Sequence, residues 1–394
     1  MILDALSKYH PTYLPRTTQQ ISPTRSSRLS APCTTAFLSP LSNSYPIPSM
    51  TSLPEAEPAS EQGASSSMDL TEEEATRYDR QMRLWGIEAQ QRMRNATILV
   101  LRLRGIATEA IKNMVLAGIG KLIIVDEGIV DEEDLGAGFF FRDGDVGMKR
   151  LDVAKSRIES LNPLVTVEAI TDTSASDDKR LEAVVKRADL VCVTDWDRDG
   201  LMRINDLCRG HHKRFYAGGT YGLIGYIFCD LLSHEYLAPD RSAPKDQPRT
   251  VKAVAEYPPL SLAIISRWST LTKRQTKEVN PALFFAIMAI WQFESKHSRL
   301  PNDVSDTNEL EAMSNSLISE ADVNKQVLTT VPRELIEPLS TTASHEFSPV
   351  CAIVGGMLAQ DILKALGGRE PPIANFFVFD GNTGGGTVCR LSMP

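Results

Sequence analysis

Residues 97–230 alternate between short apolar runs and longer amphipathic stretches. The runs at 97–103, 122–125 and 190–193 have the length of buried strands, and the stretches between them have the period of helices. This order predicts an α/β fold with a doubly wound, mostly parallel, Rossmann-like sheet. The other elements expected in this region are helices at 105–117, 146–161, 179–187 and 201–208, strands at 165–170 and 215–217, and antiparallel strands within 222–230.

The remaining sequence divides into a middle and a C-terminal part. Prolines and mixed charges in 238–277 predict a loop with some short structure. Apolar helical patterns follow at 281–293, 306–318 and 349–366, and a last strand is expected at 376–379. We therefore expect a Rossmann-like domain at 68–237, a loop and helical insertion at 238–340, and a C-terminal helix and strand at 341–394 that complete the first domain.

The N-terminal extension differs in composition. Residues 1–50 are rich in Ser, Thr and Pro, and Asp4 is their only acid. Such a composition is typical of a disordered tail, of a transit peptide, or of sequence upstream of a true start at Met50 or Met68. We expect a disordered extension over 1–67, with the fold beginning at the capping-box pattern of Thr71 and Glu74.

Charge and composition exclude several classes of partner. The net charge of −8 disfavours binding to nucleic acid or to anionic membranes, because such binding requires a cationic field. No apolar run approaches the roughly 20 residues that span a bilayer. The six cysteines include no Cys-x-x-Cys pair of the kind found in zinc sites. We expect no nucleic-acid partner, no membrane partner and no metal site.

The turn after the first strand looks degenerate as a nucleotide site. Phosphate binding there requires several glycines, so that backbone amides can approach the phosphate oxygens, and only Gly105 is present. Leu103 and Ala107 add side chains where a phosphate would lie. Asp126 ends the second strand, the position from which a carboxylate binds a ribose hydroxyl, although an aspartate there also commonly braces a turn. Gly105 and Asp126 are therefore the candidate remnants of a cofactor site.

A long motif at 78–86, Tyr-Asp-Arg-Gln-Met-Arg-Leu-Trp-Gly, resembles the opening motif of the ubiquitin-like activating enzymes. Shorter similarities recur at 112–120, 131–136, 161–163, 348–356 and 376–381. In this family two homologous units of the ThiF-type adenylation fold pair. The adenylating unit binds ATP and Mg, activates the C-terminal carboxylate of a modifier protein, and passes the modifier to a cysteine.

This chain departs from the adenylating pattern of the family. The glycine loop is thinned, and the segments at 134–139 and 194–199 lack the expected Asn-Arg-Gln and Asp-Asn-x-x-x-Arg residues. The resemblance therefore implies an inactive copy, the non-catalytic partner subunit of a heterodimer. Such a subunit binds no cofactor and no metal itself, whereas ATP and Mg belong to the catalytic partner.

The resemblance implies a role for Arg80. In the family this arginine reaches in trans into the partner's ATP site, and a guanidinium suits that role because its planar fork matches phosphate oxygens. The alternative is an ordinary ion pair with Asp79 or Glu88. Arg80 is thus the candidate catalytic residue, in a supporting role.

None of the cysteines is a convincing nucleophile. Cys351 lies near a helix N-terminus, which would stabilise a thiolate, but apolar neighbours favour core packing. The region 238–340, where a catalytic subunit of the family holds its cysteine domain, contains no cysteine. The thioester step is therefore expected on another chain.

Chain length favours the SUMO-activating branch of the family, with a neddylation-type partner subunit or a scaffold as alternatives. The expected partners are the catalytic subunit, the modifier SUMO and, indirectly, a conjugating enzyme. The chain would act as an obligate subunit of a ligase-class enzyme and be inactive alone, in the nucleus and in the cytoplasm. An independent adenylating enzyme or a nicotinamide-dependent oxidoreductase would require the intact glycine loop that is missing here.

Overall fold

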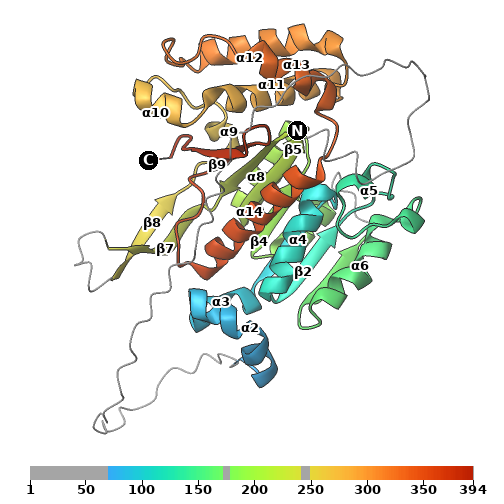
Figure 1. Cartoon of the computed structure of the whole chain (residues 1–394). Helices are drawn as coiled ribbons and strands as arrows, with labels where there is room; N and C mark the ends of the chain where they lie inside the picture. The colour runs from blue at the N-terminus through green and yellow to red at the C-terminus, as the bar shows by residue number, and fades with distance from the viewer. Residues whose placement is uncertain (1–69, 172–177, 241–248, 394) are drawn as a thin grey trace, which may run out of the picture. The chain divides into compact units, whose positions relative to one another are not determined.

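An eight-stranded mixed sheet lies at the centre of the fold (Figure 1). This computed structural model describes residues 70–171, 178–240 and 249–393, so the expectation for residues 1–67 lies outside the described residues. The strand order is β10-β9-β6-β5-β4-β1-β2-β3. The strands are β1 (Thr97–Leu101), β2 (Lys121–Val125), β3 (Thr166–Ile170), β4 (Leu190–Thr194), β5 (Arg214–Tyr221), β6 (Ile224–Asp230), β9 (Phe376–Asp380) and β10 (Gly385–Cys389).

The sheet is parallel on one side and antiparallel on the other. β3, β2, β1, β4 and β5 run parallel, and β6, β9 and β10 continue the sheet in antiparallel pairs. The continuous apolar runs are explained by burial of both faces. In β1, Ile98 contributes to one hydrophobic core, whereas its neighbour Leu99 contributes to the other. The predicted α/β class with a mostly parallel, Rossmann-like sheet is confirmed.

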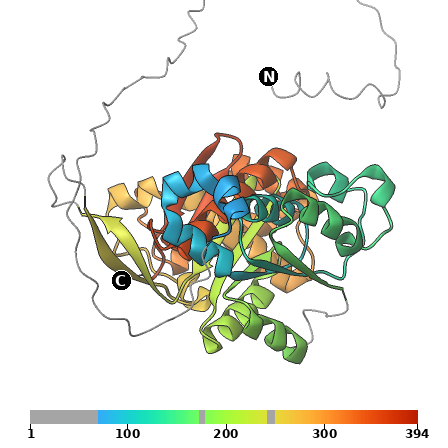
Figure 2. The same cartoon turned by 90° about the horizontal axis from the view of Figure 1, so that it is seen from below.

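Helices cover both faces of the sheet (Figure 2). α4 (Gly105–Ala117) and α14 (Ser348–Gly367) pack together on one face, and α7 (Asp178–Arg187) and α8 (Arg198–Gly210) lie on the other. By length and composition α14 could cross a membrane, but 61% of its most apolar window is buried inside the fold. This burial identifies α14 as a core helix.

The N-terminal part of the fold contains α2 (Glu72–Trp85) and α3 (Ile87–Asn95). The capping box forms as predicted: the Glu74 amide donates to the Thr71 hydroxyl at 3.2 Å, and the Thr71 amide donates to the Glu74 carboxylate at 2.9 Å. Two further helices are α5 (Asp134–Ala137) and α6 (Arg150–Leu161). The latter begins later than the expected residue 146, because Gly147 has a positive φ of 87° that breaks the helix.

The middle region is more ordered than its prolines suggest. β7 (Ser233–Pro239) pairs with β8 (Thr250–Glu256), so the division placed between residues 237 and 238 falls inside a strand. The helices that follow are α9 (Leu260–Ala263), α10 (Lys273–Glu278), α11 (Pro281–His297), α12 (Thr307–Glu320) and α13 (Arg333–Thr342). Trp291 of α11 packs edge-on against Tyr226 of β6, with ring centroids 5.2 Å apart. The insertion therefore shares a core with the sheet.

Candidate functional site

The candidate site lies where the carboxyl ends of β1 and β4 meet. The chain leaves β1 towards α4 on one face of the sheet and leaves β4 towards α8 on the other, which makes this edge the topological switch point. Each strand is followed by a residue of positive φ, Arg102 at 71° and Asp195 at 49°, so both loops turn sharply at once. Nucleotides bind at this position in Rossmann-like folds.

The N-terminus of α4 is occupied by a carboxylate of the same chain. The Gly105 amide donates to Glu346 Oε1 at 3.1 Å, and Arg104 Nε lies 3.4 Å from Glu346 Oε2. A helix N-terminus attracts anions because its free amides and the helix dipole carry partial positive charge. Glu346 therefore takes the place that a phosphate would need.

Gly105 is required here for packing. A Cβ atom at this position would lie 2.9 Å from the Ala137 Cβ and 3.0 Å from the Cys351 Sγ. The glycine thus lets α5 and α14 approach the start of α4, and its presence needs no phosphate to explain it.

The expected obstruction by Leu103 and Ala107 is wrong in its detail. Both side chains are fully buried and belong to the hydrophobic core between the sheet, α4 and α14. Neither side chain lines the cavities at this edge of the sheet. The obstruction comes instead from Glu346.

Asp126 braces the loops that surround it. Its Oδ2 accepts a hydrogen bond from the Leu103 amide at 2.8 Å, and its Oδ1 accepts one from the Gly128 amide, also at 2.8 Å. An arginine guanidinium, that of Arg150, lies 3.9 Å away. These bonds are those of a turn-bracing aspartate, in which each carboxylate oxygen already accepts one backbone N–H.

Buried carboxylates make the crevice unfavourable for additional negative charge. Burial raises the pKa of Asp195 to about 7, and the charge of Glu346 adds to this rise. Burial also raises the pKa of Glu294 to about 7. The pKa of Glu346 is raised by burial as well, although Arg104 opposes the rise. Among the described residues, no three His, Cys, Asp or Glu side chains gather in a way that could hold a metal ion.

The size of the crevice leads to the same conclusion. The cavity between Arg104, Asp195 and Glu346 measures about 80 Å³, whereas ligand pockets usually exceed about 300 Å³. A neighbouring cavity of about 290 Å³ lies beside Asp126 and Trp196, which is room for a nucleoside. Because the phosphate end is filled by Glu346, these residues do not fit a nucleoside triphosphate.

Arg80 lies on the exposed side of α2. Its side chain is exposed and forms no ion pair or hydrogen bond with the residues that the structure describes. Asp79 instead pairs with Arg83, at 3.0 Å between Oδ2 and Nε. The alternative role of Arg80, an ion pair with Asp79 or Glu88, is therefore not observed in the folded chain.

The cysteines of the described region are core residues. Cys192, Cys208, Cys229, Cys351 and Cys389 are all buried free thiols, and Cys33 lies outside the described residues. Burial raises the pKa of the Cys351 thiol far above its ordinary value. A thiol of this kind stays protonated and does not attack an acyl group at neutral pH.

Comparison with known proteins places this fold in a family. The family model described as ThiF family matches residues 78–394, which includes the whole sheet together with α4 and α14. The chain belongs to the ThiF family.

The ThiF-family chain is similar along most of its length to curated proteins. It is 33% identical over 343 residues to "SUMO-activating enzyme subunit 1" of Xenopus tropicalis, an alignment that covers 81% of this chain and 96% of that protein. The protein of the same name from Homo sapiens is 34% identical over 340 residues, with 81% and 95% covered. That of Dictyostelium discoideum is 33% identical over 325 residues, with 81% and 94% covered.

Glu346, the residue that decides the chemistry of this ThiF-family site, has no recognisable signature in the sequence. Glu346 lies 241 residues from Gly105 in the sequence, and no spacing rule links two such positions. Its only local signal is its place just before the apolar helix that begins at Ser348. The anion beside Arg104 in this loop is Glu346, whose Oε2 lies 3.4 Å from Arg104 Nε.

Proposed function

We propose that this chain is the regulatory subunit of a heterodimeric SUMO-activating enzyme. It would support ATP-dependent adenylation of SUMO and its thioester transfer, both carried out on a catalytic partner subunit. The observation that carries the proposal is the end-to-end match to proteins named SUMO-activating enzyme subunit 1, of which 94–96% is covered in the three comparisons above.

The geometry of the site supports a division of labour between the subunits. ATP and Mg bind the catalytic partner, because in this chain Glu346 fills the α4 N-terminus and buried carboxylates surround it. The thioester forms on the partner, because the described cysteines are buried. The chain alone is therefore inactive, contacts SUMO within the heterodimer, and meets the conjugating enzyme only indirectly. Its location, by family resemblance, is the nucleus with a share in the cytoplasm.

Arg80 is the contribution of this chain to catalysis. An exposed guanidinium that pairs with no carboxylate of the described ranges can bind the phosphates of ATP held by the partner. Placed against the developing negative charge of adenylation, it would lower the barrier by electrostatic stabilisation.

The test is SUMO-dependent ATP–pyrophosphate exchange with this chain alone, with the catalytic subunit, and with Arg80→Ala in the pair. We expect no exchange by the lone chain, exchange by the pair, and a loss of about 100-fold in kcat with Arg80→Ala, the size typical for removal of one charge-stabilising donor. Arg80→Lys should recover part of the loss, because it keeps the charge without the planar fork.

Arg77→Ala is the matched control, because Arg77 lies one turn earlier on α2 and forms a surface ion pair with Glu73. It should leave exchange within about twofold of the wild type. Exchange by the lone chain would overturn the proposed division of labour. Full activity of the heterodimer with Arg80→Ala would mean that this chain acts only as a scaffold. Exchange that requires a modifier other than SUMO would assign the chain to another branch of the ubiquitin-like activating enzymes.

A further inference from the structure

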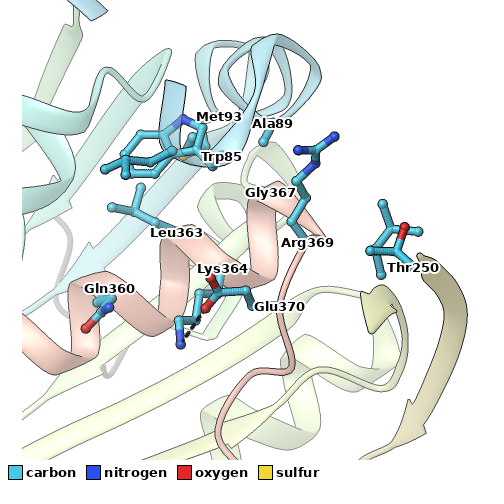
Figure 3. Close-up of a pocket in the computed structure, with 12 residues that line it drawn as sticks. Trp85, Ala89, Met93, Thr250, Gln360, Leu363, Lys364, Gly367, Arg369 and Glu370 are labelled. Atoms are coloured by element: carbon cyan, nitrogen blue, oxygen red, sulfur yellow. Dashed lines mark ion pairs between the residues drawn. The ribbon is translucent and has the colours of Figure 1, made fainter. Parts of the chain in front are cut away.

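A second cavity shares no lining residue with the cavities at the nucleotide edge. It measures about 350 Å³ and opens between the junction of α2 and α3, the C-terminal end of α14 and the β7–β8 hairpin (Figure 3). Its walls are apolar: Trp85, Ala89 and Met93 come from the N-terminal helices, and Leu363 faces them from α14. The Trp85 indole N–H donates a hydrogen bond to Gln90 Oε1 at 3.0 Å. Its only polar group is therefore satisfied, and the ring can contact an apolar ligand.

The rim of this pocket carries an excess positive charge. Arg369 is exposed, and its guanidinium packs beside Gly86 without an ion pair to any residue of the described ranges. Lys364, the other cation at the rim, is neutralised by Glu370 at 3.0 Å. An anionic group bound at the rim would therefore meet the one guanidinium that is still available there.

Two further side chains favour a peptide over other ligands. Gln360, one turn before Leu363 on α14, has an exposed amide without a hydrogen bond to the described residues, and such an amide can bond both the N–H and the C=O of an extended peptide. Leu84 at the rim is 81% exposed, although it is a large apolar residue. An apolar wall with a tryptophan and an arginine is the composition of interaction hot spots.

We propose that this pocket binds a short peptide segment of another protein, which presents one large apolar side chain followed by a carboxylate. The apolar side chain enters between Trp85 and Leu363, the peptide backbone bonds Gln360, and the carboxylate pairs with Arg369. The volume accommodates one or two side chains and is too small for a folded element. Leu84 lies one turn after Arg80 on α2, so the rim borders the surface that Arg80 would present to the catalytic partner, but the peptide contacts themselves do not involve Arg80.

The test is selection of phage-displayed random dodecapeptides on the full-length chain, followed by affinity measurement on the synthetic consensus peptide. We expect enrichment of a large apolar residue with Asp or Glu following it. Arg369→Glu should weaken the consensus peptide by at least about 10-fold and, in a repeated selection, exchange the acidic preference for Lys or Arg. Leu84→Ser should also weaken binding. Both positions are exposed, so neither variant threatens the fold.

Lys325→Glu provides the charge-matched control, because Lys325 is an exposed cation after α12 with no part in the pocket. It should leave the affinity unchanged. Enrichment without an acidic preference, or a consensus that ignores Arg369→Glu, would overturn the proposal. So would sedimentation data in which the chain pairs with a second copy and Leu84→Ser dissolves the pair, since the pocket would then be a self-association surface.

Discussion

Asp195 makes the stability of the fold depend on pH. Its pKa of about 7 lies above the ordinary value of 3.8, because burial disfavours the charged form. A carboxyl with a raised pKa binds its proton more tightly in the folded state than in the unfolded state. Its contribution to the free energy of unfolding is therefore fully present below about pH 4 and is lost as the pH rises through about 7. Asp195→Asn removes the ionisable group, and with it the loss of stability at higher pH. We expect the variant to be more stable than the wild type in urea at pH 8, with a much smaller gain at pH 5.

The exposed Asp322 serves as the control, and Asp322→Asn should change the unfolding free energy by less than about 0.5 kcal/mol at both pH values. If Asp195→Asn instead destabilised the protein at pH 8, the carboxylate would be held ionised by Arg102 and Arg104, and the direction of its pKa shift would be wrong.

Individual site residues show where sequence reasoning works and where it stops. Asp126 was predicted as either a ribose ligand or a turn residue, and its two backbone hydrogen bonds are those of a turn residue. The role of Arg80 stays a prediction, because it concerns a partner chain. Glu346 was not predicted, since contacts between distant segments leave no periodic signal in the sequence.

At the scale of elements, α4 and α14 pack closely against each other behind the crevice. A Cβ on Gly355 would lie 2.7 Å from the Ile106 carbonyl oxygen, whereas a Cβ on the adjacent Gly356 would meet only Asn113, at 4.0 Å. Gly355→Ala should therefore push the helices apart and cost about 1–3 kcal/mol. Gly356→Ala should stabilise the protein by about 0.5–1 kcal/mol, because alanine loses less conformational freedom in a helix.

Urea unfolding of the two alanine variants checks this prediction, and each serves as the control for the other. Equal stabilisation by both would mean that α14 is not held as close to α4 as the structure has it.

Elements with strong local signals were predicted, and those that depend on tertiary packing were not. β1, β2 and β4 are buried on both faces and read as continuous apolar runs. β8 is mostly exposed and mixes valine with charged residues, so its sequence carries no such run. α13 contains Pro338, which ordinarily argues against a helix interior. Packing against the rest of the fold decides the structure in both cases.

At the scale of the whole molecule, the insertion and the sheet should unfold together. Phe284 of α11 packs on Phe376 of β9 with ring centroids 5.2 Å apart, and Trp291 donates a hydrogen bond to Tyr221 at 2.7 Å. Elements that share one core lose their packing cooperatively. We expect urea transitions followed by circular dichroism and by tryptophan fluorescence to coincide, in variants that keep only Trp85 or only Trp291. An earlier transition of the Trp291 signal would show that the insertion melts by itself.

The Glu346 carboxylate competes with any free anion for the Gly105 amide at the α4 N-terminus. A tethered group has an effective concentration set by its own chain, and it does not diffuse away. A free anion at the α4 N-terminus therefore competes with a permanent internal ligand, whose occupancy is independent of dilution and of nucleotide supply. In the proposed heterodimer, a single subunit then senses ATP, so activity should rise with ATP concentration without cooperativity between two nucleotide sites.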